Sequence, residues 1–236
     1  MSKRRGAPGP AAEPGASVGA RVATLLDAVL ARFAAGRWQD EVVRAREEWL
    51  ERAGRVYDDE GSYEHRVDTF HEWYALQRPL GDGPVPAARY LADEGGRLPA
   101  EDAASLRALC RSQWSLWQVI EVDGPAIALF DLLRGGRFDV DLDRDLPGLE
   151  AGDLFEARII GLHGRLCFTR AFLFHPREAS ASIEAFLEAA RRRGEGQEAI
   201  LFRLAQVRLR CDRYRNLAAD KVYEQALWPF TRARAR

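Results

Sequence analysis

The sequence predicts an α+β protein with a helical N-terminal region, a small antiparallel β module and a helical C-terminal region. We predict a small antiparallel sheet for the β module and only lean toward an SH3- or OB-like barrel, in which closure would remove exposed strand edges. Towards both ends of the chain, apolar residues recur at spacings of three and four, which is typical of amphipathic helices. Near the centre the pattern changes to short apolar runs and strict alternation, which indicates strands.

Five segments follow from these patterns. Residues 1–17 form a leader of Gly, Pro and Ala, which we expect to be disordered because it buries little apolar surface. The helical region spans 18–113, the β module 114–176 and the C-terminal helices 177–230. Residues 231–236 alternate Arg and Ala, and we expect this tail to fray.

The helical region begins with an apolar stripe from Val22 to Phe33, and Gly36 is placed to end that helix. A second helix, with a solvated face of Arg and Glu, is expected up to Tyr57. Ser62 is a candidate N-cap for a third helix. After a Pro-rich break at 79–86, short helices are expected at 87–93 and 100–110.

The β module begins with two apolar runs, 116–122 and 126–132, separated by a Gly-Pro turn. Apolar residues then alternate with Asp from 138 to 143, the pattern of a half-buried strand. Two further strands flank His163-Gly164, which we expect to form a tight hairpin turn. About five strands suit a small sheet or barrel.

In the C-terminal region a first helix carries an apolar stripe from Ile183 to Ala190, before a run of arginines. The next helix has an apolar seam that favours a partner helix. The seam consists of Ile200, Leu204, Val207, Cys211, Tyr214 and Ala218. A last helix is expected over 220–227, with its end near Pro229.

The composition excludes several classes of protein. Of the 236 residues, 47% are hydrophobic and 30% charged, which is typical of a globular chain. A net charge of -1 argues against coating nucleic acid by bulk charge. There is no apolar stretch of about 18 residues and no signal peptide, so we expect a cytoplasmic protein without a membrane partner. Cys110, Cys167 and Cys211 form no CxxC pair and suit a reducing cytosol.

A set of residues between about 63 and 175 resembles uncharacterised bacterial proteins that often carry a C-terminal SEC-C zinc motif. The matching pieces are Phe70-His71-Glu72-Trp73, Pro86, Tyr90-Leu91, Ser112 to Val119, Asp131-Leu132, Gly136 to Val140, Gly152-Asp153 and Arg158. The closely spaced cysteines of the zinc motif are absent here. The resemblance therefore implies helices that lead into a small β module, and it implies no reaction.

The residues that could bind a metal ion are better explained as solvated residues of a strand and a helix. The acidic cluster consists of Asp131, Asp139, Asp141, Asp143, Asp145 and Asp153. An EF-hand loop that began at Asp139 would need Gly where Arg144 stands, so a solvated strand is the better interpretation. Glu64, Asp68 and His71 share a helix face, which is an ordinary wet face. We expect no metal and no cofactor.

No catalytic constellation is recognisable. The chain has neither a Gly-x-Ser-x-Gly elbow nor a phosphate-binding glycine loop, and we assign no catalytic residue. His163 and His175 are expected to be structural or exposed. Asp153 and Arg158 are expected to form a structural salt bridge. A metal-dependent hydrolase that uses Asp139 or Asp141 remains an alternative function.

The C-terminal region is basic. From residue 176 to the end there are 13 basic and 8 acidic residues, a difference of five. Seven arginines form the candidate interaction surface: Arg191, Arg192, Arg193, Arg208, Arg210, Arg213 and Arg215. A basic surface of this kind could contact phosphates, so a nucleic-acid-binding protein is another alternative.

We interpret the chain as a non-enzymatic cytoplasmic interaction or regulatory protein that binds a protein partner or a second copy of itself. Six tryptophans and the arginine-rich helices support this interpretation, because Trp and Arg anchor protein interfaces. Trp73 and Trp117 are the candidate aromatic anchors.

Overall fold

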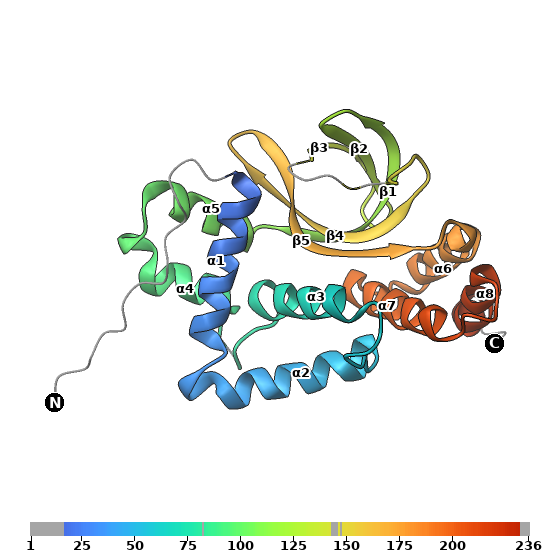
Figure 1. Cartoon of the computed structure of the whole chain (residues 1–236), viewed down its shortest axis with the longest axis horizontal. Coiled ribbons are helices and arrows are strands. Elements are labelled where there is room, and N and C mark those ends of the chain that lie inside the picture. The colour runs from blue at the N-terminus through green and yellow to red at the C-terminus, as the bar shows by residue number, and fades with distance from the viewer. Residues whose placement is uncertain (1–16, 82, 143–145, 147, 232–236) are drawn as a thin grey trace.

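The computed structural model describes residues 17–81, 83–142, 146 and 148–231. Figure 1 shows a barrel above a layer of helices, with further helices at both ends of that layer. This is the predicted α+β class: N-terminal helices, a central five-stranded barrel and C-terminal helices. The predicted leader, apart from Ser17, and residues 232–236 lie outside the described residues.

The N-terminal helices have the expected order. They are α1 (Val18–Phe33), α2 (Gln39–Ala53), α3 (Tyr63–Leu76), α4 (Pro86–Glu94) and α5 (Ala100–Cys110). The Ser17 hydroxyl caps α1 by accepting a hydrogen bond from the Ala20 amide at 3.2 Å. Ser62 stands immediately before α3 as predicted, but its side chain makes no capping hydrogen bond.

Five strands close into the barrel within the described part of the chain. They are β1 (Gln113–Asp123), β2 (Ala126–Asp131), β3 (Arg137–Asp141), β4 (Leu154–Leu162) and β5 (Arg165–His175), in the order β1-β2-β3-β5-β4. Neighbouring strands are antiparallel, as expected, except where β3 and β5 pair in parallel through Asp141 and Cys167. The module is therefore a mixed barrel. The predicted hairpin turn at His163-Gly164 is confirmed, with φ values of 52° and 76°.

The barrel has its own interior, whose buried side chains include Trp117, Phe155, Phe168 and Phe172. The Trp117 indole donates to the Ala157 carbonyl at 2.9 Å, which satisfies its one polar group inside this apolar space.

A larger core connects the barrel to both sets of helices. Its centre is an aromatic cluster in which Trp49 of α2 lies 5.3 Å from Trp73 and 5.0 Å from Phe202, between ring centroids. Trp114 of β1 joins it, 5.8 Å from Phe202. The same core includes Leu116 of β1, so a barrel strand contributes side chains to both cores.

The C-terminal helices are α6 (Ser180–Arg193), α7 (Gln197–Arg213) and α8 (Ala219–Thr231). Gly194 ends α6 in the left-handed conformation, with φ 67°, which an L side chain disfavours. The apolar stripe of α6 is buried as predicted. None of the described helices combines the length and apolar character needed to cross a membrane.

Two details of the C-terminal prediction are wrong. Ile200, Leu204 and Val207 are buried, but Tyr214 lies beyond the end of α7 and is exposed, so the seam is shorter than expected. The last helix begins at Ala219 and continues through Pro229. A proline within the helix costs one backbone hydrogen bond. Tertiary contacts of α8 with α6 and α7 offset that cost, as tertiary packing generally outweighs local propensity.

Candidate functional site

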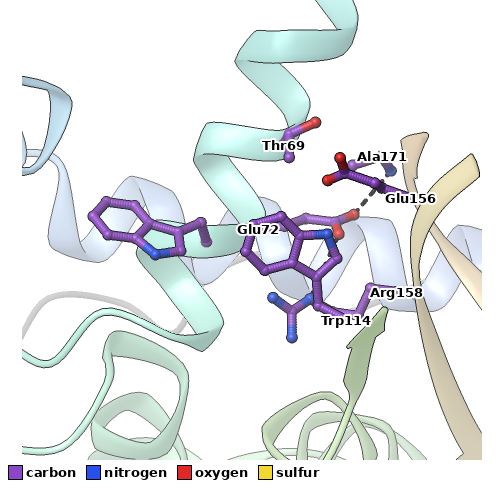
Figure 2. Close-up of a pocket in the computed structure, with 7 residues that line it drawn as sticks. Thr69, Glu72, Trp114, Glu156, Arg158 and Ala171 are labelled. Atoms are coloured by element: carbon purple, nitrogen blue, oxygen red, sulfur yellow. Dashed lines mark hydrogen bonds and ion pairs between the residues drawn. The ribbon is translucent and has the colours of Figure 1, made fainter. Parts of the chain in front are cut away.

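Ionisable side chains are buried together where α3 meets the barrel. Figure 2 shows Thr69 and Glu72 of α3 beside Glu156 and Arg158 of β4, around a small cavity. The strand β4 has apolar surroundings on both faces, so its polar residues are enclosed as well. This cluster was not predicted from the sequence, because Glu156 and Arg158 stand in an otherwise apolar strand. Their face of the strand is buried only because helices pack against it in the folded protein.

Glu72 joins α3 to β5. Its carboxylate accepts a hydrogen bond from the Thr169 hydroxyl at 2.8 Å and from the Arg170 and Ala171 amides at 3.0 Å each. Arg158 lies 3.7 Å from it. Burial raises the pKa of Glu72, and the charge of Arg158 together with these hydrogen bonds opposes that shift.

A second buried chain of polar groups connects the barrel to α8. Glu156 Oε1 lies 3.3 Å from His175 Nε2, and His175 Nδ1 lies 2.8 Å from the Tyr223 hydroxyl. Burial raises the pKa of Glu156 well above its ordinary value, although the charge of Arg66 opposes this. Burial, with the nearby cations Arg208 and Arg66, lowers the pKa of His175 to about 3.

Arg66 links three helices. From α3 it donates to the Ala53 carbonyl at the end of α2, at 3.1 Å, and to the Ala205 carbonyl in α7. Its guanidinium is buried, and this burial lowers its pKa to about 10. The side chain therefore stabilises a helix junction by supplying donors to carbonyls that water does not reach.

The cavity in this cluster is too small for a substrate. Its volume is about 10 Å³, which is close to the smallest space that holds one water molecule. Ligand sites are generally clefts of roughly 300 Å³ or more. The cluster therefore has the perturbed groups of an active site but no room for a reactant, and we interpret it as a structural joint.

The candidate arginines are mostly engaged within the chain. Arg191 donates to the Leu132 carbonyl, Arg193 to the Phe230 carbonyl and Arg208 to the Phe174 carbonyl. Three others have acceptors or acidic partners as well: Arg192 with Glu188, Arg213 with Glu60 and Arg215 with the Asp212 carbonyl. Six of the seven candidate arginines therefore contact acceptors or acidic side chains of this chain.

Trp73 and Trp117 are core residues, each only 1% exposed. The Trp73 indole donates to Glu198 at 3.0 Å. Both side chains are enclosed by the helical core or the barrel, so the interpretation of these two as surface anchors is corrected. Their aromatic character reflects the large volume that each core has to fill.

The predicted Asp153–Arg158 salt bridge is wrong. Asp153 pairs with Arg177 after β5, and this partner lowers the pKa of Asp153. Arg158 points into the buried cluster instead, where it donates to Gln77 at 3.2 Å. The two residues belong to different networks: Asp153 lies beside Arg177, whereas Arg158 lies beside Glu72 of α3.

The remaining acidic candidates lie apart. Asp131 is buried and accepts hydrogen bonds from Ser115 and Gln113. Asp68 pairs with Arg170 at 3.0 Å. Asp143 and Asp145 lie outside the described residues. Among the residues that the structure describes, no three His, Cys, Asp or Glu side chains gather in a group that could hold a metal ion.

Two open grooves flank α8 on the surface. The α6/α8 groove encloses about 430 Å³ and is lined by Glu178, Ala181, Ser182, Ala185, Asp220, Glu224, Leu227, Trp228 and Thr231. The α7/α8 groove has a similar volume of about 430 Å³ and is lined by Arg210, Tyr214, Leu217, Val222, Gln225 and Ala226. These grooves lie at the end of the molecule where α6, α7 and α8 meet (Figure 1).

Large apolar side chains are exposed at both grooves. Trp228 is 49% exposed in the α6/α8 groove, and Tyr214 and Leu217 are 57% and 49% exposed in the other. Of the predicted site residues, Arg210 lines a groove. The position of Tyr214 at this surface was not predicted, because its spacing from the apolar residues of α7 indicated a buried residue.

The comparisons with known proteins give no family for this chain. No family model matches it, and neither a curated protein nor a solved structure gives a significant match. The resemblance to proteins that carry the SEC-C motif stays a prediction.

Proposed function

We propose that this chain is a non-enzymatic cytoplasmic protein that acts by binding a protein partner at the two grooves that flank α8. The observation that carries the proposal is the contrast between these grooves and the buried cluster. The grooves are open, each about 430 Å³, and display large apolar side chains. The cluster of perturbed ionisable groups is closed around about 10 Å³.

Exposed aromatic residues support a binding surface at α8. Tyr and Trp are enriched among the residues that dominate interface energies, because each buries much apolar area with few rotatable bonds. Here Tyr214 and Trp228 lie on opposite sides of one helix. A partner that covers α8 would contact both.

Site-specific photo-crosslinking tests the proposal. A photoreactive residue replaces Ser182 in one groove or Leu217 in the other, in the full chain, within the cells that produce it. We expect both positions to capture the same protein. A photoreactive residue at the exposed Arg107 of α5 is the control and should capture none of it. Equal capture from all three positions, or none from either groove, would refute the proposal.

The nucleic-acid alternative has weaker support. Arg191, Arg193 and Arg208 already donate to backbone carbonyls of this chain, so a phosphate would have to compete with those acceptors. Binding to phosphates weakens steeply with salt. If nuclease treatment abolishes the crosslinked species and added salt weakens its formation, the alternative replaces the proposal above.

A further inference from the structure

The acidic residues of the α6/α8 groove concentrate at one end. Glu178 precedes α6, while Asp220 and Glu224 lie in the first two turns of α8. Lys221 pairs with Glu224 at 2.9 Å, whereas Arg177, the chain neighbour of Glu178, pairs with Glu150 and Asp153. Within the described residues neither Glu178 nor Asp220 forms a salt bridge, and none of the side chains given for the groove is basic, so its described lining is acidic although its chain segment is basic overall.

The residues that line the groove from α6 are small. Ala181, Ser182 and Ala185 face it from α6, and their short side chains allow another chain to approach this helix closely. Leu227 and Trp228 line the groove from α8. The surface therefore combines acidic, small and apolar side chains in one groove.

We propose that the α6/α8 groove binds a positively charged segment of a partner protein. Such a segment places a guanidinium or ammonium group among Glu178, Asp220 and Glu224, and an apolar side chain beside Leu227 and Trp228. This inference rests on the proposed function and names the chemistry of the partner. Charge complementarity selects the occupant, because an acidic segment would bring like charges together and lose affinity.

The size of the groove suits a peptide segment. A volume of about 430 Å³ falls within the range of roughly 300–1,000 Å³ that is typical of clefts for small molecules, so the groove has room for a few side chains of such a segment. An amphipathic helix that lays its apolar residues into a groove, with cations along the edge, is a recurrent mode of peptide recognition. The small residues of α6 leave space for the side chains of such a helix.

Peptide binding by fluorescence anisotropy tests the inference. The probe is a labelled amphipathic peptide of Leu, Ala and Arg, and its counterpart has Glu in place of every Arg. We expect the full chain to bind the Arg peptide and not the Glu peptide. The double variant Glu178→Gln with Asp220→Asn should weaken binding of the Arg peptide about 10-fold, the effect of losing roughly 1.4 kcal/mol.

A matched variant controls for net charge. Glu184→Gln with Glu188→Gln removes the same two charges from exposed positions of α6 that do not line the groove. It should bind the Arg peptide like the unmodified chain. Equal weakening by both double variants would overturn the inference in favour of non-specific attraction.

Two further outcomes separate other occupants. If the Arg peptide binds only a chain that ends at Thr231, residues 232–236 of this chain are the occupant and the partner inference is overturned. If the probe fails and sedimentation shows a dimer that Glu178→Gln with Asp220→Asn dissociates, a second copy is the occupant.

If the crosslinked partner persists in this double variant, the proposed function stands and only the basic chemistry of the partner is refuted.

Discussion

At the scale of single residues, His175 has a chemistry that its sequence context does not disclose. It is enclosed between Glu156 and Tyr223, with no water-exposed side chain surface. Burial and two nearby arginines disfavour the protonated form of the imidazole, and they therefore lower the pKa of His175. From the sequence we expected a structural or exposed histidine after a strand, because no local pattern identifies neighbours that are distant along the chain.

His175 therefore makes stability depend on pH. Its pKa falls from 6.5 in the unfolded chain to about 3 in the folded protein. Between these pH values the unfolded chain holds a proton on this residue that the folded protein lacks. The contribution of His175 to the free energy of unfolding is therefore complete above pH 6.5 and is lost as the pH falls towards 3. We expect this residue alone to lower the free energy of unfolding by about 2 kcal/mol between pH 6.5 and 5.

The variant His175→Gln lacks this dependence, and urea denaturation at several pH values measures the difference. Glu72 and Glu156 have raised pKa values, so their contributions are lost as the pH rises. Both glutamates remain in the variant. We therefore expect their effects on the free energy of unfolding to cancel when the pH profile of the variant is subtracted from that of the unmodified chain. His65→Gln, at an exposed position of α3, is the control. If His175→Gln and His65→Gln change the pH profile alike, the burial argument is wrong.

At the scale of elements, Gly54 shows how a helix end is coupled to its neighbour. It ends α2 with φ 91°, a conformation that L side chains rarely adopt. A Cβ atom at this position would also lie 2.9 Å from Leu209 Cδ2 in α7. Gly36 has a positive φ of 60° as well, but a Cβ there meets nothing within 4 Å.

This pair of glycines separates backbone strain from packing. We expect Gly36→Ala to lower the free energy of unfolding by about 1 kcal/mol, the cost of the left-handed conformation alone. Gly54→Ala should cost about 2–4 kcal/mol, because the contact with Leu209 adds overpacking. Chemical denaturation measures both values. In the double variant with Leu209→Ala, the cost of adding Ala at position 54 should fall towards that at position 36; if it does not, the contact with Leu209 is not the cause.

Local sequence predicted most elements at this scale. The alternation of apolar and Asp residues indicated β3, and the spacing from Ile183 to Ala190 indicated α6. Pro229 misled the prediction because a local rule on proline was outweighed by the packing of α8 against α6. The parallel contact of β3 with β5 was not predicted, since pairing between distant strands leaves no local pattern.

At the scale of the whole molecule, the barrel depends on the helices. Trp114 and Leu116 of β1, with Leu154 of β4, belong to the core that the helices share. Glu72 of α3 also supplies acceptors to backbone amides of β5. Removing the helices would expose these apolar side chains and leave two amides without their acceptor.

We therefore expect residues 113–176 alone to remain unfolded or to aggregate, although their strands close into a barrel in the full chain. Backbone amide NMR of this fragment checks the expectation, and the full chain provides the reference spectrum. Well-dispersed amide signals from the isolated fragment would contradict it and would show that the inner core around Trp117 suffices.

The sequence by itself determined the class of fold, the order of helices and strands, and most turns, because amphipathic periodicity and turn residues act over a few neighbouring positions. Only the tertiary structure decided which side chains meet. It placed Glu156 beside His175, assigned Arg158 to Glu72 instead of Asp153, and buried Trp73 and Trp117. It also gathered three acidic side chains of a basic segment into the α6/α8 groove. These contacts depend on how elements that are distant along the chain pack together, and neither local residue spacing nor net charge predicts that packing.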